Sequence, residues 1–171
     1  ITQRKAINSS SSVRVSASAG TGKTKVLTDR VLALLLDGTD PHQILCLTFT
    51  RAAAAEMANR INQALAIWAE SSDQELFVKV FLLTGEKPDK KALSRARCLF
   101  SEVLDIPGGM KIQTLHAFCE SLLSRFPLEA GLSPHFSVMD ELEASDVLKE
   151  ARTKLVMRAR YEKDGLLTSA L

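Results

Sequence analysis

The chain has 171 residues, of which 46% are hydrophobic and 25% are charged. This length and composition are typical of one compact globular domain with a hydrophobic core. The 22 Lys and Arg residues against 20 Asp and Glu residues give a net charge of +2, which neither requires nor excludes a nucleic-acid partner. No apolar run approaches the length of a membrane span and no signal peptide is visible, so no membrane partner is expected.

Helices and strands alternate along the predicted chain. Apolar spacing and break residues predict helices over residues 2–8, 23–37, 51–70, 73–83, 91–104 and 115–126, and a long helix or a helix pair over 141–162. Short apolar runs predict strands over residues 13–16, 44–47 and 111–114. The run at 44–47 is continuously apolar, as expected of a strand buried on both faces of a parallel sheet. This alternation predicts an α/β domain with a parallel sheet.

The segment from Ala17 to Thr24, with sequence ASAGTGKT, carries the clearest chemical signal. A glycine-rich turn between a strand and a helix exposes successive N–H groups to an anion, and the helix N-terminus adds positive charge there. Ala19, Gly20, Thr21 and Gly22 would cradle phosphates, Lys23 would reach the β- and γ-phosphates, and Thr24 would bind Mg²⁺. Lys23 and Thr24 are therefore the catalytic candidates, with a structural glycine turn as the alternative.

Two further segments follow directly after predicted strands. They are 48–51 and 113–116, and ligands bind at the carboxyl ends of parallel strands. We therefore expect both segments and the phosphate loop to line one edge of the sheet.

The three cysteines, Cys46, Cys98 and Cys119, have no metal-ligand spacing. We predict that they are reduced core residues of a cytosolic protein.

Four segments in order resemble the UvrD/Rep/PcrA-like superfamily 1 DNA helicases. Residues 3–7 (QRKAI) resemble the Q motif, 17–24 motif I, 47–57 (LTFTRAAAAEM) motif Ia and 113–118 (QTLHAF) motif Ib. These helicases often carry Ala at the position of Ala17. Segments 107–109, 118–120 and 126–131 are similar to the bacterial AddA family. Arg51-Ala52 stands where the family often has Asn-Lys, and Leu115 replaces a commoner Phe or Ile.

The resemblance implies an ATP-dependent DNA helicase with a RecA-like P-loop fold. Residues 1–126 would form part of domain 1A with a helical insertion near 71–106, and residues 127–171 would begin the helical 1B subdomain. ATP and Mg²⁺ would be the cofactors, and single-stranded DNA and double-stranded DNA ends the substrates. The resemblance also implies an AddB-like nuclease partner, 3′-to-5′ translocation and a role in double-strand break repair. It further implies a nuclease function elsewhere in the full protein and a location in the bacterial cytoplasm, associated with the nucleoid.

The resemblance also assigns roles to single residues. Gln3 would read adenine through its amide, since an amide pairs with the N6 and N7 edge. Thr48, Thr50, Arg51, Thr114 and His116 would contact DNA. The alternatives are that Thr50 is only a helix N-cap and that His116 is a structural hydrogen-bonding residue.

Other noticeable side chains favour structural roles. Phe49 and Trp68 are expected in the core, and Glu56 on the surface. Asp140-Glu141 after an apolar run has the form of a Walker B motif, but the run is short and interrupted, so we interpret it as structural.

The ends of the chain predict an excerpt of a longer protein, because it begins at Ile1 without Met and stops at Leu171 without a clear terminator. No Walker B pair or arginine finger is identifiable in it, so we expect weak nucleotide binding and almost no turnover from these residues alone. A nucleotide-regulated P-loop binding module without motor activity is the alternative function.

Overall fold

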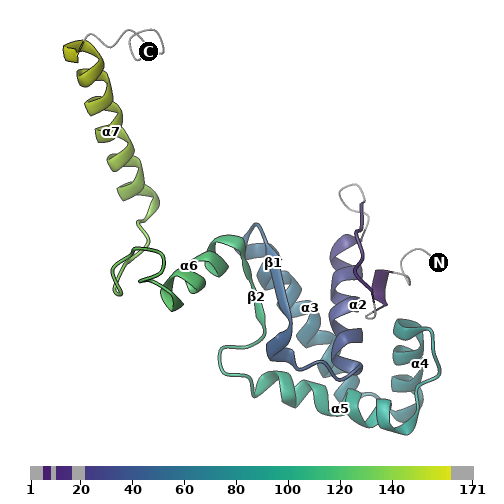
Figure 1. Ribbon diagram of the computed structural model, residues 1–171. Helices are drawn as coiled ribbons and strands as arrows, with labels where there is room; N and C mark the ends of the chain where they lie inside the picture. Colours follow the sequence, from purple (N-terminus) through teal and green to yellow (C-terminus); the bar gives the residue numbers. More distant parts are fainter. Residues whose placement is uncertain (1–5, 9–10, 17–21, 163–171) are drawn as a thin grey trace. The chain divides into compact units, whose positions relative to one another are not determined.

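A computed structural model describes residues 6–8, 11–16 and 22–162 (Figure 1). The chain falls into two compact units, Ile1–Cys119 and Glu120–Leu171, and each is described by itself. Gln3, Ala17, Ala19, Gly20 and Thr21 lie outside the described residues. Among the helices that are described, none combines the length and apolarity needed to cross a bilayer.

The described part of the first unit consists of two strands and the helices packed around them. In chain order it contains α2 (Lys23–Leu36), the short 3-10 helix η1 (Pro41–Gln43), β1 (Leu45–Thr48), α3 (Arg51–Glu70), α4 (Asp73–Thr84), α5 (Lys90–Leu104), β2 (Lys111–Thr114) and the start of α6 (Leu115–Arg125). These bounds confirm the predicted helices from residue 23 onward and the strands at 44–47 and 111–114, each to within one residue at each end. Of the predicted helix over 2–8, Ala6 and Ile7 are described and are helical.

The sheet is parallel, as predicted, and pairs β1 with β2. Cys46 lies opposite Ile112, and Thr48 lies opposite Thr114. α3 packs against both strands and against α5. Cys46 and Ile112 therefore contact the hydrophobic core.

The opposite face of β1 is open in the described structure. Leu45 is 42% exposed and Leu47 is 43% exposed. The prediction that this strand is buried on both faces is therefore wrong for the described residues. Successive side chains of a strand point to opposite faces, and α3 covers the face that carries Cys46.

The prediction of a strand over residues 13–16 is also wrong. These residues have no strand structure, and Val13 and Val15 are each 42% exposed. A strand requires backbone hydrogen bonds to a neighbouring strand. In the described structure β1 and β2 pair only with each other, so residues 13–16 lack that partner.

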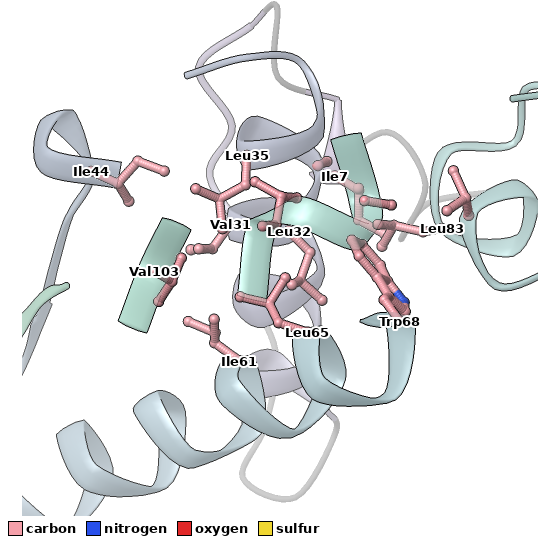
Figure 2. Packing of buried hydrophobic residues seen from close by; sticks show 14 of the residues in the cluster. Ile7, Val31, Leu32, Leu35, Ile44, Ile61, Leu65, Trp68, Leu83 and Val103 are labelled. Atoms are coloured by element: carbon pink, nitrogen blue, oxygen red, sulfur yellow. The ribbon is translucent and has the colours of Figure 1, made fainter. Parts of the chain in front are cut away.

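The core is a helical cluster in which four helices meet (Figure 2). Every third or fourth residue of α3 is buried, as a 3.6-residue period requires. Trp68 lies at the end of this stripe and is buried, which confirms the prediction for it. The buried core residues of the four helices are Val31, Leu32, Ala33 and Leu35 of α2, Met57, Ile61, Leu65 and Trp68 of α3, Leu76, Val80 and Leu83 of α4, and Ala96, Leu99 and Val103 of α5.

Helix α5 also provides polar caps for two neighbouring helices. Arg95 Nε donates a 2.7 Å hydrogen bond to the Leu35 carbonyl near the end of α2. Arg97 donates to the Ala69 carbonyl in the last turn of α3 at 3.2 Å and to Asp73 Oδ1 at 2.6 Å. Guanidinium groups at helix C-termini satisfy orphan carbonyls and complement the negative end of the helix dipole.

A capping box begins α4. The Ser72 hydroxyl accepts from the Glu75 N–H, and the Ser72 N–H donates to Glu75 Oε2 at 3.0 Å. The hydrogen bonds from the Ser72 backbone and hydroxyl, aided by Lys79, lower the pKa of Glu75. A lowered pKa in the folded state means that this carboxylate stabilises the fold above its unfolded pKa, and that the stabilisation is lost as the pH falls through the folded value.

The cysteines are free thiols, but the core prediction for them is mostly wrong. Cys98 and Cys119 are exposed, and Cys46 is half-buried. Burial raises the pKa of the Cys46 thiol. Cys98 directly precedes the buried Leu99 of α5. Successive residues of a helix are rotated by 100° about its axis, so Cys98 points away from the face that Leu99 buries.

The second unit contains the end of α6, a connecting segment and α7 (Glu141–Glu162). The helix predicted over 141–162 is confirmed. Many apolar side chains of this unit are exposed, including Phe126, Leu128 and Leu142.

We expect Leu65→Ala to lower the free energy of unfolding of this chain by about 2–5 kcal/mol, because it leaves a cavity at a fully buried position of α3. Ile67→Ala is the matched control on the exposed side of the same helix, and should change it by less than about 1 kcal/mol. Urea denaturation measures both. Equal losses from the two variants would contradict the packing described for α3.

Candidate functional site

The N-terminus of α2 is formed by a residue in a left-handed conformation. Gly22 has φ 83° and ψ 21°, occupies the N-cap position and provides no side-chain cap. A Cβ at Gly22 would meet no atom within 4 Å, so the backbone conformation rather than space is what favours glycine here. The N–H groups of the first helical turn lack intrahelical partners, and anions bind at such positions.

Lys23 and Thr24 are the first two residues of α2, and both are half-buried. They lie in the turn where the dipole of the helix is most positive. A lysine and a hydroxyl at this turn are the residue types that hold nucleotide phosphates and a magnesium ion, so the described part of the predicted loop fits these ligands. Gln3, Ala19, Gly20 and Thr21 stay predictions, since they lie outside the described residues.

A cavity of about 480 Å³ lies elsewhere on the first unit. Its lining includes Ala33, Leu36 and Asp37 at the C-terminal end of α2, and Pro88 and Ala92 near the start of α5. Leu36 lies 13 residues after Lys23, which is about 20 Å along a helix. This cavity is therefore separate from the candidate phosphate site.

The carboxyl ends of β1 and β2 bring the other predicted segments together. Thr48 and Thr114 are paired in register. The Thr50 hydroxyl accepts from the Ala53 N–H at 3.1 Å, and the Thr114 hydroxyl accepts from the Ala117 N–H at 3.1 Å. Segments 48–51 and 113–116 thus line one edge of the sheet, as expected. Helices α3 and α6 both begin at this edge.

The threonine interactions bear on the alternatives for these residues. Thr50 is an N-cap, as the structural alternative predicted. The Thr48 hydroxyl donates to the Thr50 carbonyl at 3.0 Å, which fixes the turn between β1 and α3. A threonine cap satisfies one N–H of the first turn, so other N–H groups of the turn stay available to an anion.

Phe49 is the residue at this edge whose position was predicted wrongly. It is 87% exposed, whereas a core position was expected. It stands in the turn between Thr48, the last residue of β1, and the N-cap Thr50, so its ring extends into solvent instead of into the core.

Arg51 and His116 are both exposed at this same edge, in the first turns of α3 and α6. Glu56 lies one turn further along α3, is exposed as predicted, and forms a 2.6 Å ion pair with Arg60. The edge therefore combines an aromatic ring, a guanidinium, an imidazole and two helix N-termini.

Asp140 has a structural role in the second unit. Its Oδ1 accepts from the Glu143 N–H at 2.8 Å, and its own N–H donates to Glu143 Oε2 at 3.3 Å. This reciprocal pair is a capping box that begins α7. Residues 137–140 are not a strand, so the geometry favours the structural interpretation over a Walker B motif.

Comparison with known proteins gives one family and a consistent set of relatives. The chain matches the UvrD/REP helicase N-terminal domain over residues 1–167. It is 37% identical over 166 residues to an ATP-dependent helicase/nuclease subunit from Pediococcus pentosaceus, covering 96% of the chain and 12% of that relative. It is 37% identical over 162 residues to the protein of the same name from Desulforamulus reducens, covering 89% of the chain and 11% of that relative.

The corresponding protein of Lactobacillus gasseri is 35% identical over 164 residues, covering 95% of the chain and 12% of that relative. The chain thus spans about an eighth of the length of these relatives. The match to the family covers nearly all of the chain. The chain belongs to the UvrD/REP helicase N-terminal domain family.

Proposed function

We propose that this chain is the ATP- and DNA-binding N-terminal part of an ATP-dependent DNA helicase of the AddA type. The observation that carries the proposal is the shared edge of β1 and β2, where two helix N-termini and the exposed Phe49 lie together. The left-handed Gly22 at the start of α2 supports the nucleotide half of the proposal. In this proposal the sheet is part of a RecA-like domain 1A, and residues 127–171 begin subdomain 1B.

The start of α2 would bind ATP. Lys23 would contact the β- and γ-phosphates, the first-turn N–H groups would donate to phosphate oxygens, and the Thr24 hydroxyl would hold Mg²⁺. When bound, Mg²⁺ would neutralise charge that develops during phosphoryl transfer to water. Gln3 would select adenine through its amide. Asp140, which caps α7, is not the residue that activates water.

The edge formed by β1 and β2 would bind single-stranded DNA. Phosphates would lie at the N-termini of α3 and α6, near Thr50, Arg51, Thr114 and His116. The Phe49 ring would stack on a base, because base stacking on aromatic rings is tolerant of sequence and suits a translocating enzyme. Thr48 would support this site indirectly by fixing the turn that carries Phe49.

The relatives, which are named as helicase/nuclease proteins, suggest the role of the whole protein. It would couple ATP hydrolysis to 3′-to-5′ translocation during double-strand break repair, in the bacterial cytoplasm. An AddB-like protein would be its partner, and a nuclease function would reside elsewhere in the full protein.

Lys23→Ala in the intact protein should reduce the rate of phosphate release stimulated by single-stranded DNA by about 100-fold or more. The reason is that the variant lacks the cation that would stabilise the negative charge developing on the phosphates in the transition state. Lys91→Ala, an exposed lysine of α5, is the matched control and should retain the wild-type rate. Hydrolysis by the wild type that is indifferent to DNA would favour the nucleotide-regulated binding module instead.

Phe49→Ala should raise the dissociation constant for an oligothymidylate by about 5- to 100-fold, the effect of losing one base–aromatic stacking interaction. Fluorescence anisotropy measures this constant. Phe49→Trp should keep the affinity, and Leu45→Ala, on the exposed face of β1 at its other end, should leave it unchanged. A Phe49→Ala protein that binds DNA as tightly as the wild type would remove Phe49 from the DNA site.

Asp140→Ala in the intact protein should leave the rate of ATP hydrolysis within about twofold of the wild type. It should lower the free energy of opening of the first turn of α7 by about 1 kcal/mol, the typical cost of losing an N-cap. Hydrogen exchange of the first turn of α7 reports the second effect. Loss of hydrolysis with an intact α7 would return Asp140 to the candidates for a catalytic carboxylate.

A further inference from the structure

Thr28 of α2 carries a buried hydroxyl that no described residue satisfies. The residue lies in the second turn of the helix and is 6% exposed, and its Oγ1 has no hydrogen-bond partner in the part of the chain that the structure describes. Helical threonines commonly donate to the carbonyl four residues earlier. Thr84 and Thr153 both do so in their own helices, at 3.0 Å and 2.9 Å. Thr28 makes no such bond.

The hydroxyl of Thr28 lies on the face of α2 that packs into the core. It shares this face with the buried Val31, Leu32 and Leu35. A buried hydroxyl without a partner destabilises a fold, because its lost hydration is not replaced. Valine has almost the same shape and would fill the position without this cost. In native proteins such a group commonly binds an ordered water or belongs to a functional site.

The nearest candidate site on α2 is the turn that contains Thr24. Thr24 precedes Thr28 by four residues, so the two side chains are neighbours on one face of the helix, with Cβ atoms roughly 5–6 Å apart. Each Cα–Cβ bond of a helix tilts toward its N-terminus, which directs the Thr28 side chain toward the turn of Thr24. Two hydrogen bonds of about 2.8 Å that share one water oxygen cover a similar distance. A single water therefore fits the separation expected of the two hydroxyls.

We propose that Thr28 is a positioning residue for the Mg²⁺ site, which holds the Thr24 hydroxyl through one ordered water so that its oxygen faces the metal. The proposal rests on the proposed ATPase function, in which Thr24 holds Mg²⁺. A hydroxyl that binds a metal through its oxygen still has a proton to donate. The water accepts this proton and donates one of its own to Thr28 Oγ1. Thr28 thus acts on the metal without contacting it.

The test measures equilibrium binding of a fluorescent ATP analogue to the intact protein as the Mg²⁺ concentration is varied. Thr28→Val should raise the Mg²⁺ concentration at half-maximal effect by about 10- to 100-fold, the usual result of removing a partner that orients a metal ligand. Binding in EDTA should stay unchanged. Thr28→Ser keeps the hydroxyl and should retain the wild-type Mg²⁺ dependence. Thr153→Val, which removes an exposed hydroxyl from α7, is the matched control.

Urea denaturation without nucleotide separates this role from a structural one. Thr28→Val removes a hydroxyl that has no partner among the described residues, so its urea midpoint should equal or exceed that of the wild type. A lower midpoint, with nucleotide binding weakened equally in Mg²⁺ and in EDTA, would overturn the proposal. An unchanged Mg²⁺ dependence in Thr28→Val would do the same. Absence of Mg²⁺-dependent nucleotide binding by the wild type would instead be a failure of the proposed function.

A measurement on the wild type covers the case in which Thr28→Val does not fold. A crystal structure of the intact protein with Mg²⁺ and a non-hydrolysable ATP analogue should show one water within about 3.2 Å of both the Thr24 and the Thr28 hydroxyl oxygens. Metal bound by Thr24 with no such water would overturn the proposal.

Discussion

The packing of α3 is the interaction on which the rest of the first unit depends. One side of this helix contacts both strands, and its buried stripe contacts α2 and α5. Ile61 and Leu65, in the middle of the stripe, are fully buried. Because α3 begins three residues after β1 ends, this packing also determines where Phe49 and Thr50 lie relative to the sheet. The position of the proposed DNA-binding edge is therefore a consequence of how the core is built.

The threonines at that edge illustrate how a structural and a functional interpretation of one residue can both hold. Thr50 and Thr114 each cap a helix, and each sits at the carboxyl end of a strand. A cap stabilises the helix that presents its remaining N–H groups to a phosphate. Removing either hydroxyl would disturb the helix start and the proposed DNA site together, so mutation of the threonines alone cannot separate the two roles. Phe49 caps no helix, and it can be altered with less consequence for the fold.

The sequence predicted the features that local interactions determine. Helical periodicity gave α3 and α5 to within a residue at each end, since the inward-facing positions of a helix recur along a short stretch of chain. The meeting of segments 48–51 and 113–116 followed from the rule for parallel strands. The failures concern features that depend on distant partners. Residues 13–16 have strand-forming residues but no neighbouring strand in the described structure, and Leu47 is apolar but uncovered on its face of the sheet.

Side-chain exposure was harder to predict than secondary structure for the same reason. Phe49 and Trp68 are both large aromatic residues and both were expected in the core, yet only Trp68 is buried. Trp68 continues the periodic stripe of α3, so its burial follows from its helix. Phe49 stands in a turn, where no period indicates which way a side chain points. The sequence thus predicted where the candidate site lies, but it predicted the wrong environment for Phe49 within it.

The polarity of the helices links the core to the proposed chemistry. Arg95 and Arg97, two residues apart on α5, cap the C-terminal ends of α2 and α3 through the Leu35 and Ala69 carbonyls. Figure 1 shows α2 and α3 starting at the same end of the first unit, so their positive ends face the proposed nucleotide and DNA sites. The guanidinium groups lie at the other, negative ends of these helices, where cations are favourable. The Leu35 carbonyl also accepts from the Gly38 N–H at 3.2 Å, so at the end of α2 the guanidinium adds its charge to a carbonyl that already has a backbone partner.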